Sequence, residues 1–491
     1  MSARSLRDSA LSGVRWTVAA RFGLQLITWP VTILVMRLLE PRDYGLLALA
    51  IIVIGFIALF SELGLGAGLV QAHTVDDARA RTASGVIIAL NLMIAVLLVV
   101  AAPFIAAWFN EPALTPVMRV LTLELVISSF AAVPSALLER QLRFRELSLA
   151  LIIGNVSGSA VTVIAALSGL GVWSLVLGAM TIAVTRTLAL LFYHGGIVWP
   201  PLSLDLTPVR ELARFSGHVI GARVLWYWYS QSDQVIVGRM LHGAQLGNYN
   251  VASQLAALPV GKVMDTVNRV SFPVLSRLRE DVDTLRVTCQ RLLGLFAVYS
   301  IGVCWGLASV AADFVHVVLG PQWYKAVPVL AILALVAPLR TISSLHNTMT
   351  TAVGSPQAAT KELALASFIT PLAILAGATW NGLNGAAIAW LGVSPVLYVL
   401  SAWLTANALQ LRLRDCVKPL ATPMLCGAIM YAVVWVTGVG LAARVPAAGL
   451  LVIKILAGAA AYLLAMRLVG PRVLRDGLAL GRELMRPGAT A

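Results

Sequence analysis

The stretch GARVLWYWYSQSDQVIVGRMLHGAQLGNYNVA, residues 221–252, is apolar and long enough to cross a bilayer, yet it carries polar groups along its length. At about 100° per residue, these groups gather on one side of a helix. The members of this polar stripe are Arg223, Tyr227, Ser230 and Gln234, with Trp226 and Asp233 on its flank. Polar groups at that depth are costly unless they face a cavity or a partner. The stretch therefore predicts a membrane helix that lines a functional site.

A similar stripe occurs near the N-terminus. Sliding the sequence by roughly 200 residues pairs Arg21 with Arg223 and Arg37 with Arg239. Small and apolar residues match at the same offset: Ala20 with Ala222, Val35 with Val237, Leu39 with Leu241, Gly45 with Gly247 and Ala50 with Ala252. The first copy of the stripe consists of Arg21, Gln25, Thr28 and Thr32. The run of matched residues predicts a duplicated half.

The composition is that of an integral membrane protein. Of the 491 residues, 59% are hydrophobic and 12% are charged, and the mean hydropathy is +0.87. Soluble proteins carry about 25% charged residues. The formal net charge of +14 would suggest nucleic-acid binding in a soluble protein. Here the cations fall mostly in short loops between apolar spans, so we expect no nucleic-acid partner.

Apolar stretches of membrane-crossing length begin near residues 14, 45, 84, 117, 147 and 172, and they resume from near residue 216 to near residue 448. They predict an all-α polytopic membrane protein with about 14 transmembrane helices. With the N-terminus inside, roughly 23 of the 36 Lys and Arg residues fall in cytoplasmic segments. Both termini are therefore expected in the cytoplasm. The basic start is expected to be a retained first span and not a cleaved signal peptide.

The duplication predicts two parallel six-helix repeats followed by two C-terminal helices. The predicted parts are an N-terminal bundle at 1–195, a cytoplasmic linker at 196–215, a C-terminal bundle at 216–410, and two extra helices with a basic tail at 411–491. Transporters with such repeats place their substrate between the halves and alternate access by moving one half against the other.

Five basic residues within the predicted spans are candidates for a cationic cavity that would hold a diphosphate: Arg21, Arg223, Lys262, Arg269 and Arg340. Arg21 and Arg223 could instead extend to the membrane interface, since arginine is long enough to snorkel. Lys262 could form an internal ion pair with Asp265 three residues later. Arg269 could reach the cytoplasmic boundary. Arg340 lies near the middle of its span, where interface contact is hardest to achieve.

Two acids, Glu62 and Asp233, are the candidates for coupling transport to H⁺ or Na⁺. Either acid could instead neutralise a neighbouring arginine. Glu124 lies in the fourth span without a repeat partner, and it stays unassigned. Arg186 and Lys454 lie near enough to span ends that we expect them to snorkel.

The polar stripes also offer groups that could contact a glycan: Gln25, Thr28, Trp226, Tyr227 and Gln234. Sugar rings stack on aromatic faces, but packing between helices also explains aromatic residues in the middle of a span.

No signature of an enzyme is found. The sequence contains no Walker A loop, paired zinc ligands or nucleophile elbow, and the four cysteines show no paired spacing. The outside loops have about ten residues, which is too few for a catalytic domain. We therefore predict a protein that is not an enzyme and that contains neither a metal site nor a cofactor.

Four motifs carry a family resemblance: RLLEPRDYGLLALA, FSELGLGAGLVQ, DQVIVGRMLHGAQLGNY and SFPVLSRLRED. In order and spacing they resemble the polysaccharide flippases of the multidrug/oligosaccharidyl-lipid/polysaccharide exporter superfamily. Within it, the likeness is to the O-antigen and exopolysaccharide exporters of the colanic-acid type, and it spans nearly the whole chain. The resemblance implies a bacterial inner-membrane flippase that moves undecaprenyl-diphosphate-linked oligosaccharide to the periplasmic leaflet through a cationic cavity.

The resemblance also implies partners, namely membrane lipid and the polysaccharide polymerase and export machinery. Two readings within the superfamily remain open. A lipid II flippase shares the cationic cavity, whereas a multidrug exporter should have an acid-dominated one. A membrane glycosyltransferase or polysaccharide polymerase is the alternative from another class, but it would need large outside loops with catalytic acids.

Overall fold

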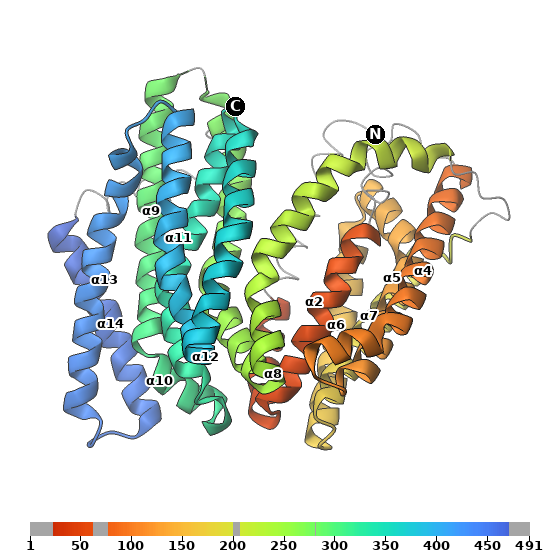
Figure 1. Ribbon diagram of the computed structural model, residues 1–491, viewed down its shortest axis with the longest axis horizontal. Coiled ribbons are helices and arrows are strands. Elements are labelled where there is room, and N and C mark those ends of the chain that lie inside the picture. Colours follow the sequence, from red (N-terminus) through yellow and green to blue (C-terminus); the bar gives the residue numbers. More distant parts are fainter. Residues whose placement is uncertain (1–22, 62–76, 200–206, 280, 471–491) are drawn as a thin grey trace. The chain divides into compact units, whose positions relative to one another are not determined.

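The computed structural model describes residues 23–61, 77–199, 207–279 and 281–470, and every regular element in these ranges is helical (Figure 1). The first helical segment is Gly23–Leu38. The others, in chain order, are α2 (Pro41–Ser61), α4 (Asp77–Phe109), α5 (Leu114–Arg140), α6 (Phe144–Leu167), α7 (Val172–His194), α8 (Thr207–Arg277), α9 (Val282–Ser309), α10 (Ala311–Phe314), η1 (Val315–Leu319), η2 (Pro321–Trp323), α11 (Ala326–Ala352), α12 (Pro356–Ala408), α13 (Leu413–Leu441) and α14 (Ala447–Val469). The predicted all-α class is confirmed.

Ten of the described helices are long and apolar enough to cross a membrane. The predicted span starts from residue 45 to residue 448 all fall within helices, while the start near residue 14 lies outside the described residues. The 71-residue α8 is not among the ten candidates. Its sequence contains many polar residues, including the polar stripe, and these lower its hydropathy.

Two of the helices turn sharply in the middle. In α8 the backbone leaves helical geometry at His242 (φ 66°), and in α12 it does so at Asn381 and Gly382 (φ 53°). A positive φ costs glycine little, which explains the glycine in the α12 turn. Each helix is thus a pair of arms. The turn in α12 lies in the glycine-rich stretch NGLNG, residues 381–385.

The chain divides into two compact units. Unit 1 contains the chain up to Tyr227 together with His242–Gly247, and unit 2 contains Trp228–Leu241 and the chain from Asn248 onward. The predicted repeats and their boundaries remain a prediction, since compactness does not test internal repetition.

In unit 1, α5 packs against α4 and α7, and α6 packs along α7. Small residues bring α6 and α7 together: a Cβ added at Gly158 would lie 2.8 Å from the carbonyl oxygen of Gly178. The Ser157 and Thr185 hydroxyls are 2.9 Å apart across the same interface. Close backbone approach through small residues is typical of membrane helices, because lipid supplies no hydrophobic driving force between them.

In unit 2, α9 packs against α11 and α13, and α11 packs along α12 (Figure 1). The core between these helices is apolar, with Leu293, Ile301 and Leu345 at most 1% exposed. The helix α14 packs on α13, and Lys454 in α14 forms a 2.6 Å ion pair with Asp313 of α10. Lys454, for which we expected snorkelling, is thus neutralised by an acid from α10.

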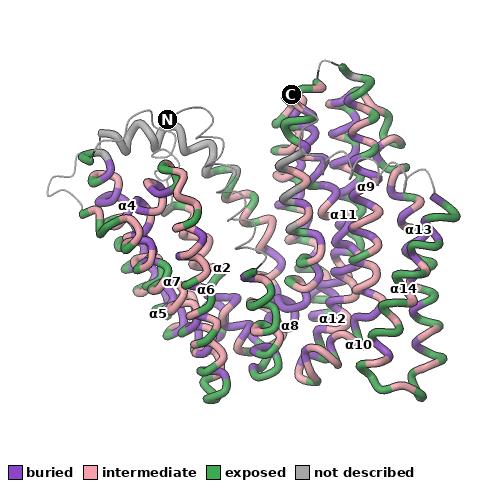
Figure 2. Tube along the Cα trace, turned by 180° about the vertical axis from the view of Figure 1, so that it is seen from behind, coloured by how far each residue is buried: buried purple, intermediate pink, exposed green. Residues whose placement is uncertain are grey.

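The outer surface of the helices is apolar. Figure 2 shows exposed and buried residues alternating along the helices of each unit. Large side chains are among the exposed ones, including Phe192 at 81% and Phe368 at 71%. A soluble protein would bury such side chains, whereas lipid tails accept them.

The N-terminus of α9 is capped by Asp281, whose carboxylate accepts a 3.1 Å hydrogen bond from the Thr284 amide. Hydrogen bonds from the Thr284 side chain and amide hold the pKa of Asp281 below its ordinary value of 3.8. Because the folded pKa is lowered, the stabilisation is present above the unfolded pKa and is lost as the pH falls through the folded one.

We expect Asp281→Ala to speed hydrogen exchange at Thr284 near neutral pH, since the amide loses its acceptor. Asp281→Asn, which keeps an acceptor oxygen, should restore much of the protection. Equal exchange in wild type and Asp281→Ala would contradict the cap.

Candidate functional site

A buried acid lies at the centre of a polar network in unit 2. Asp233, which is 2% exposed, comes from the first arm of α8. The hydroxyl of Tyr249, in the second arm, donates a 2.9 Å hydrogen bond to Asp233 Oδ2, and the amide of Gln234 donates a 2.8 Å bond to Oδ1. The turn at His242 thus folds the helix back, so that residues 16 apart in sequence meet.

A tryptophan and an arginine extend the network to the neighbouring helices. Trp390, in the second arm of α12, is fully buried, and its Nε1 donates a 2.9 Å hydrogen bond to the Tyr249 hydroxyl. The guanidinium carbon of Arg340 lies 3.9 Å from the centroid of the Trp390 ring, a cation–π contact. Arg340 also hydrogen-bonds Tyr229 and attracts Asp233 electrostatically.

A chain of side-chain amides runs beside this network. Asn250 Nδ2 donates to Gln234 Oε1 at 2.6 Å, and Gln254 Nε2 donates to Asn250 Oδ1 at 2.6 Å. Gln234 Nε2 donates in turn to Gln231 Oε1 at 3.0 Å. These bonds link the two arms of α8 and satisfy polar groups that hydrocarbon would leave without partners.

We call the group Tyr229, Asp233, Gln234, Tyr249, Asn250, Arg340 and Trp390 the unit 2 polar network. Its one cation, Arg340, is only partly buried and lies near the middle of α11. A guanidinium at this depth, oriented by an aromatic face and balanced by an acid, can bind phosphate or carboxylate oxygens. The fully buried Asp233 is less accessible and is better placed to orient its neighbours.

The structure therefore brings together three of the predicted site residues, Asp233, Gln234 and Arg340. The other candidates whose side chains the structure describes belong to unit 1. Arg223 is exposed on α8, and Trp226 is 58% exposed. Gln25 and Thr28 are partly buried in the helical segment Gly23–Leu38.

Tyr227 lies in unit 1 and serves the packing of helices. Its hydroxyl donates a 2.7 Å hydrogen bond to the carbonyl oxygen of Ile52 in α2. Its ring lies 5.9 Å from that of Phe56. These contacts agree with the alternative that aromatic residues in the middle of the span pack between helices. Trp228 belongs to unit 2 and donates to the Ser367 carbonyl at 3.1 Å.

Four predicted site residues cannot be placed. Arg21 and Glu62 lie outside the described residues, and of Lys262 and Arg269 in α8 only the helical backbone is described. A pairing between Arg21 and Arg223, or between Lys262 and Asp265, thus remains a prediction.

Sequence reasoning missed Tyr249, Trp390 and Glu362 as members of a polar interior. Glu362 is 7% exposed in α12. An acid inside an apolar span was a usable signal for Glu362. No local pattern marks Trp390, whose role depends on a contact with a residue 141 positions earlier.

A second acid joins α4–α5 to α8 within unit 1. Glu111, which is 5% exposed, accepts a 2.9 Å hydrogen bond from the amide of Gly243 and pairs with Arg42 at 3.2 Å. Next to it, a methyl group added at Gly45 would overlap the carbonyl oxygen of Gly243, and one added at Gly247 would overlap that of Pro41. These contacts place the start of α2 directly against residues 243–247.

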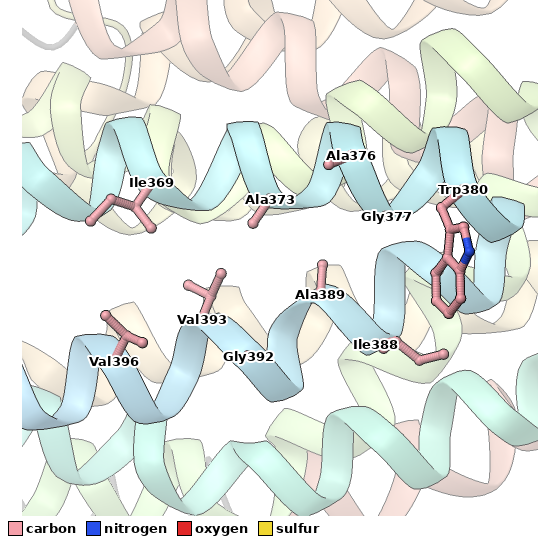
Figure 3. A pocket seen from close by; sticks show the side chains of 11 residues that line it. Ile369, Ala373, Ala376, Gly377, Trp380, Ile388, Ala389, Gly392, Val393 and Val396 are labelled. Atoms are coloured by element: carbon pink, nitrogen blue, oxygen red, sulfur yellow. The ribbon is translucent and has the colours of Figure 1, made fainter.

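An apolar groove of about 550 Å³ runs between the two arms of α12 (Figure 3). It is lined by Ile369, Ala373, Ala376, Gly377, Trp380, Gly385, Ile388, Ala389, Gly392, Val393 and Val396. This lining matches hydrocarbon, so it excludes the groove as a site for a charged or hydroxylated ligand.

Among the described residues, no group of three or more His, Cys, Asp and Glu side chains could hold a metal ion. The four cysteines are buried and free.

Comparisons with known proteins agree with this architecture. The family model described as "Polysaccharide biosynthesis protein" matches residues 34–328. The chain is 24% identical over 400 residues to the lipopolysaccharide biosynthesis protein WzxC of Escherichia coli (strain K12), covering 81% of each chain. It is 28% identical over 325 residues to the succinoglycan biosynthesis transport protein ExoT of Rhizobium meliloti (strain 1021), covering 66% of this chain and 65% of that protein.

The fold resembles a solved structure, the inward closed conformation of the lipid II flippase MurJ. The TM-score is 0.70 at 14% identity, with 96% of this chain and 99% of that chain covered. At this identity the likeness shows the fold alone, and it confirms a polytopic helical membrane protein.

Proposed function

Since the chain belongs to the polysaccharide biosynthesis protein family, whose model matches more than half of it, we propose that it is a flippase for undecaprenyl-diphosphate-linked oligosaccharide in exopolysaccharide or O-antigen biosynthesis. The family membership confirms the predicted resemblance and the prediction of a multi-pass membrane transport protein that is not an enzyme. The lipid-linked substrate and the mechanism are part of the proposal.

The observation that carries the proposal is Arg340 in the unit 2 polar network. Its guanidinium is held by Trp390 and Tyr229 near the middle of a membrane helix, which is a costly place for a cation without a ligand role. The diphosphate of a lipid carrier offers the oxygens that a guanidinium binds with paired hydrogen bonds. The names of WzxC and ExoT, which refer to lipopolysaccharide biosynthesis and succinoglycan transport, support a glycan as the other part of the substrate.

In the proposed cycle, Arg340 acts with Arg21, Arg223, Lys262 and Arg269 to hold the diphosphate in a cationic cavity. Access then alternates between the leaflets, and the polyprenyl chain stays in lipid. Gln25, Thr28, Trp226 and Gln234 contact the glycan, while Tyr227 supports the wall by packing.

Asp233 or Glu62 couples the cycle to H⁺ or Na⁺. We place the protein in the bacterial inner membrane with both termini cytoplasmic, delivering its product to a polysaccharide polymerase and export machinery.

The test is flipping of a fluorescent undecaprenyl-diphosphate oligosaccharide in proteoliposomes. We expect Arg340→Ala, and the double variant Arg21→Ala with Arg223→Ala, to slow flipping about 10- to 100-fold, the effect of losing one charged hydrogen bond in the transition state. Arg444→Ala, in the exposed turn before α14, is the control and should flip at the wild-type rate.

Wild-type rates in both sets of arginine variants would refute the diphosphate site. Movement of lipid II but not of the oligosaccharide lipid would favour the lipid II flippase instead.

A further inference from the structure

A polar pocket lies within the membrane helices of unit 1. It has a volume of about 220 Å³ and is formed by α5 and α7. Its polar lining residues are Glu124, Ser128, Ser135, Arg186 and Thr187. None of them belongs to the unit 2 polar network, and the proposed cycle does not use them.

The pocket is built from one stripe of each helix. On α5, Glu124, Ser128 and Ser135 recur at intervals of four and seven residues, so they share one face. On α7, Arg186 and Thr187 fall within the pocket-lining face. Thr187 also donates a 3.4 Å hydrogen bond to the Ile127 carbonyl of α5, which ties the two helices together beside the pocket.

Gly154 of α6 makes room for the arginine. A Cβ added at this glycine would lie 3.1 Å from the Cβ of Arg186, so a larger residue would displace the side chain. Arg186, for which we expected snorkelling, also lines a pocket together with an acid.

Four of the five polar side chains of the pocket have no protein partner in the part of the chain that the structure describes, Thr187 being the exception. Within the described residues, Glu124, Ser128, Ser135 and Arg186 form no hydrogen bond or ion pair, although Arg186 is the charge that acts on Glu124. Glu124 and Arg186 are both accessible in the pocket. Unlike charges that face a common space at bilayer depth without touching are costly unless something polar lies between them.

The charges of Glu124 and Arg186 determine which kind of ligand the pocket can bind. An anion would be repelled by Glu124, and a metal cation would be repelled by Arg186. A neutral polyol suits both groups, since a hydroxyl can donate to the carboxylate and accept from the guanidinium, and the serine hydroxyls can do either. The volume is below the roughly 300–1,000 Å³ of pockets for drug-sized ligands, so it fits one ring of a larger molecule.

We propose that the pocket of Glu124 and Arg186 binds a single neutral sugar ring of the transported glycan. This inference rests on the proposed function, because it takes the glycan to be part of the substrate. It assigns to unit 1 the recognition of sugar, separate from the recognition of diphosphate by Arg340.

The test compares binding of two probes to the full-length protein in lipid nanodiscs. One probe is undecaprenyl diphosphate carrying the oligosaccharide, and the other is undecaprenyl diphosphate without sugar. The ratio of their dissociation constants measures what the glycan adds. We expect Glu124→Gln and Arg186→Met each to reduce this ratio about tenfold, the loss of one charged hydrogen bond, while binding of the sugar-free lipid stays unchanged.

Glu139→Gln, the same substitution at an exposed position of α5 outside the pocket, is the matched control and should keep the wild-type ratio. Ser128→Ala retains both charges and should reduce the ratio less than Glu124→Gln, which guards against a variant that fails to fold.

Each other outcome overturns the inference in a distinguishable way. An unchanged ratio in both charge variants means that the pocket holds water only. An equal loss of affinity for both probes means that Glu124 and Arg186 have a structural role. If the wild-type protein bound the two lipids equally, the glycan would add nothing to the affinity and the inference would fail. If it bound neither lipid, the proposed function itself would be refuted.

Discussion

Replacing Gly247 or Gly45 by alanine is expected to destabilise unit 1 by about 3 kcal/mol, the upper range for overpacking. At either position the added methyl group overlaps a backbone carbonyl oxygen, that of Pro41 for Gly247 and that of Gly243 for Gly45. A backbone atom cannot rotate away as a side chain can, so the start of α2 and residues 243–247 must separate.

The measurement is the midpoint of thermal unfolding of the purified protein in detergent. Gly392→Ala and Gly23→Ala are the controls, because a methyl group at either position meets nothing within 4 Å. They should unfold at the wild-type midpoint or above it, since alanine favours helix over glycine by about 1 kcal/mol. If Gly247→Ala unfolded at the same midpoint as these controls, the two backbones would not be in close contact.

Tyr249→Phe is the second change with a large expected effect. It removes one hydroxyl and takes a hydrogen-bond partner from two buried atoms, Asp233 Oδ2 and the Trp390 indole nitrogen. Each unsatisfied group costs about 1–3 kcal/mol, so the free energy of unfolding should fall by about 2–6 kcal/mol. Because Trp390 also holds Arg340, flipping should slow as well.

Tyr324→Phe is the matched control. Tyr324 is 76% exposed, and removing its hydroxyl should change neither stability nor transport. If Tyr249→Phe behaved like this control, the hydrogen bonds of the unit 2 polar network would be without energetic consequence.

The helices were largely predictable because their signal is local. A run of apolar residues of sufficient length predicts a span without knowledge of its neighbours, and the glycines at residues 381–385 predict the turn in α12. The exception is α8, where the polar residues that mark it as functional also remove it from the apolar candidates.

The site was only partly predictable because its signal is not local. Asp233 and Arg340 were recognisable as charges within spans, but their partners were not. Tyr249 reaches Asp233 only because α8 turns at His242, and Trp390 arrives from α12. Lys454 shows the same limit, since its position in α14 gives no sign of Asp313.

The contacts of the paired glycines are reciprocal: position 41 meets 247, and position 45 meets 243. At the offset that pairs Gly45 with Gly247, Pro41 pairs with Gly243, so each side presents the same two positions to the other. Two copies of one polypeptide related by a two-fold axis make this pattern at an isologous interface. Under the predicted duplication, the gene fusion would have joined subunits that already associated, and the ancestor is expected to have been a homodimer of half-length chains.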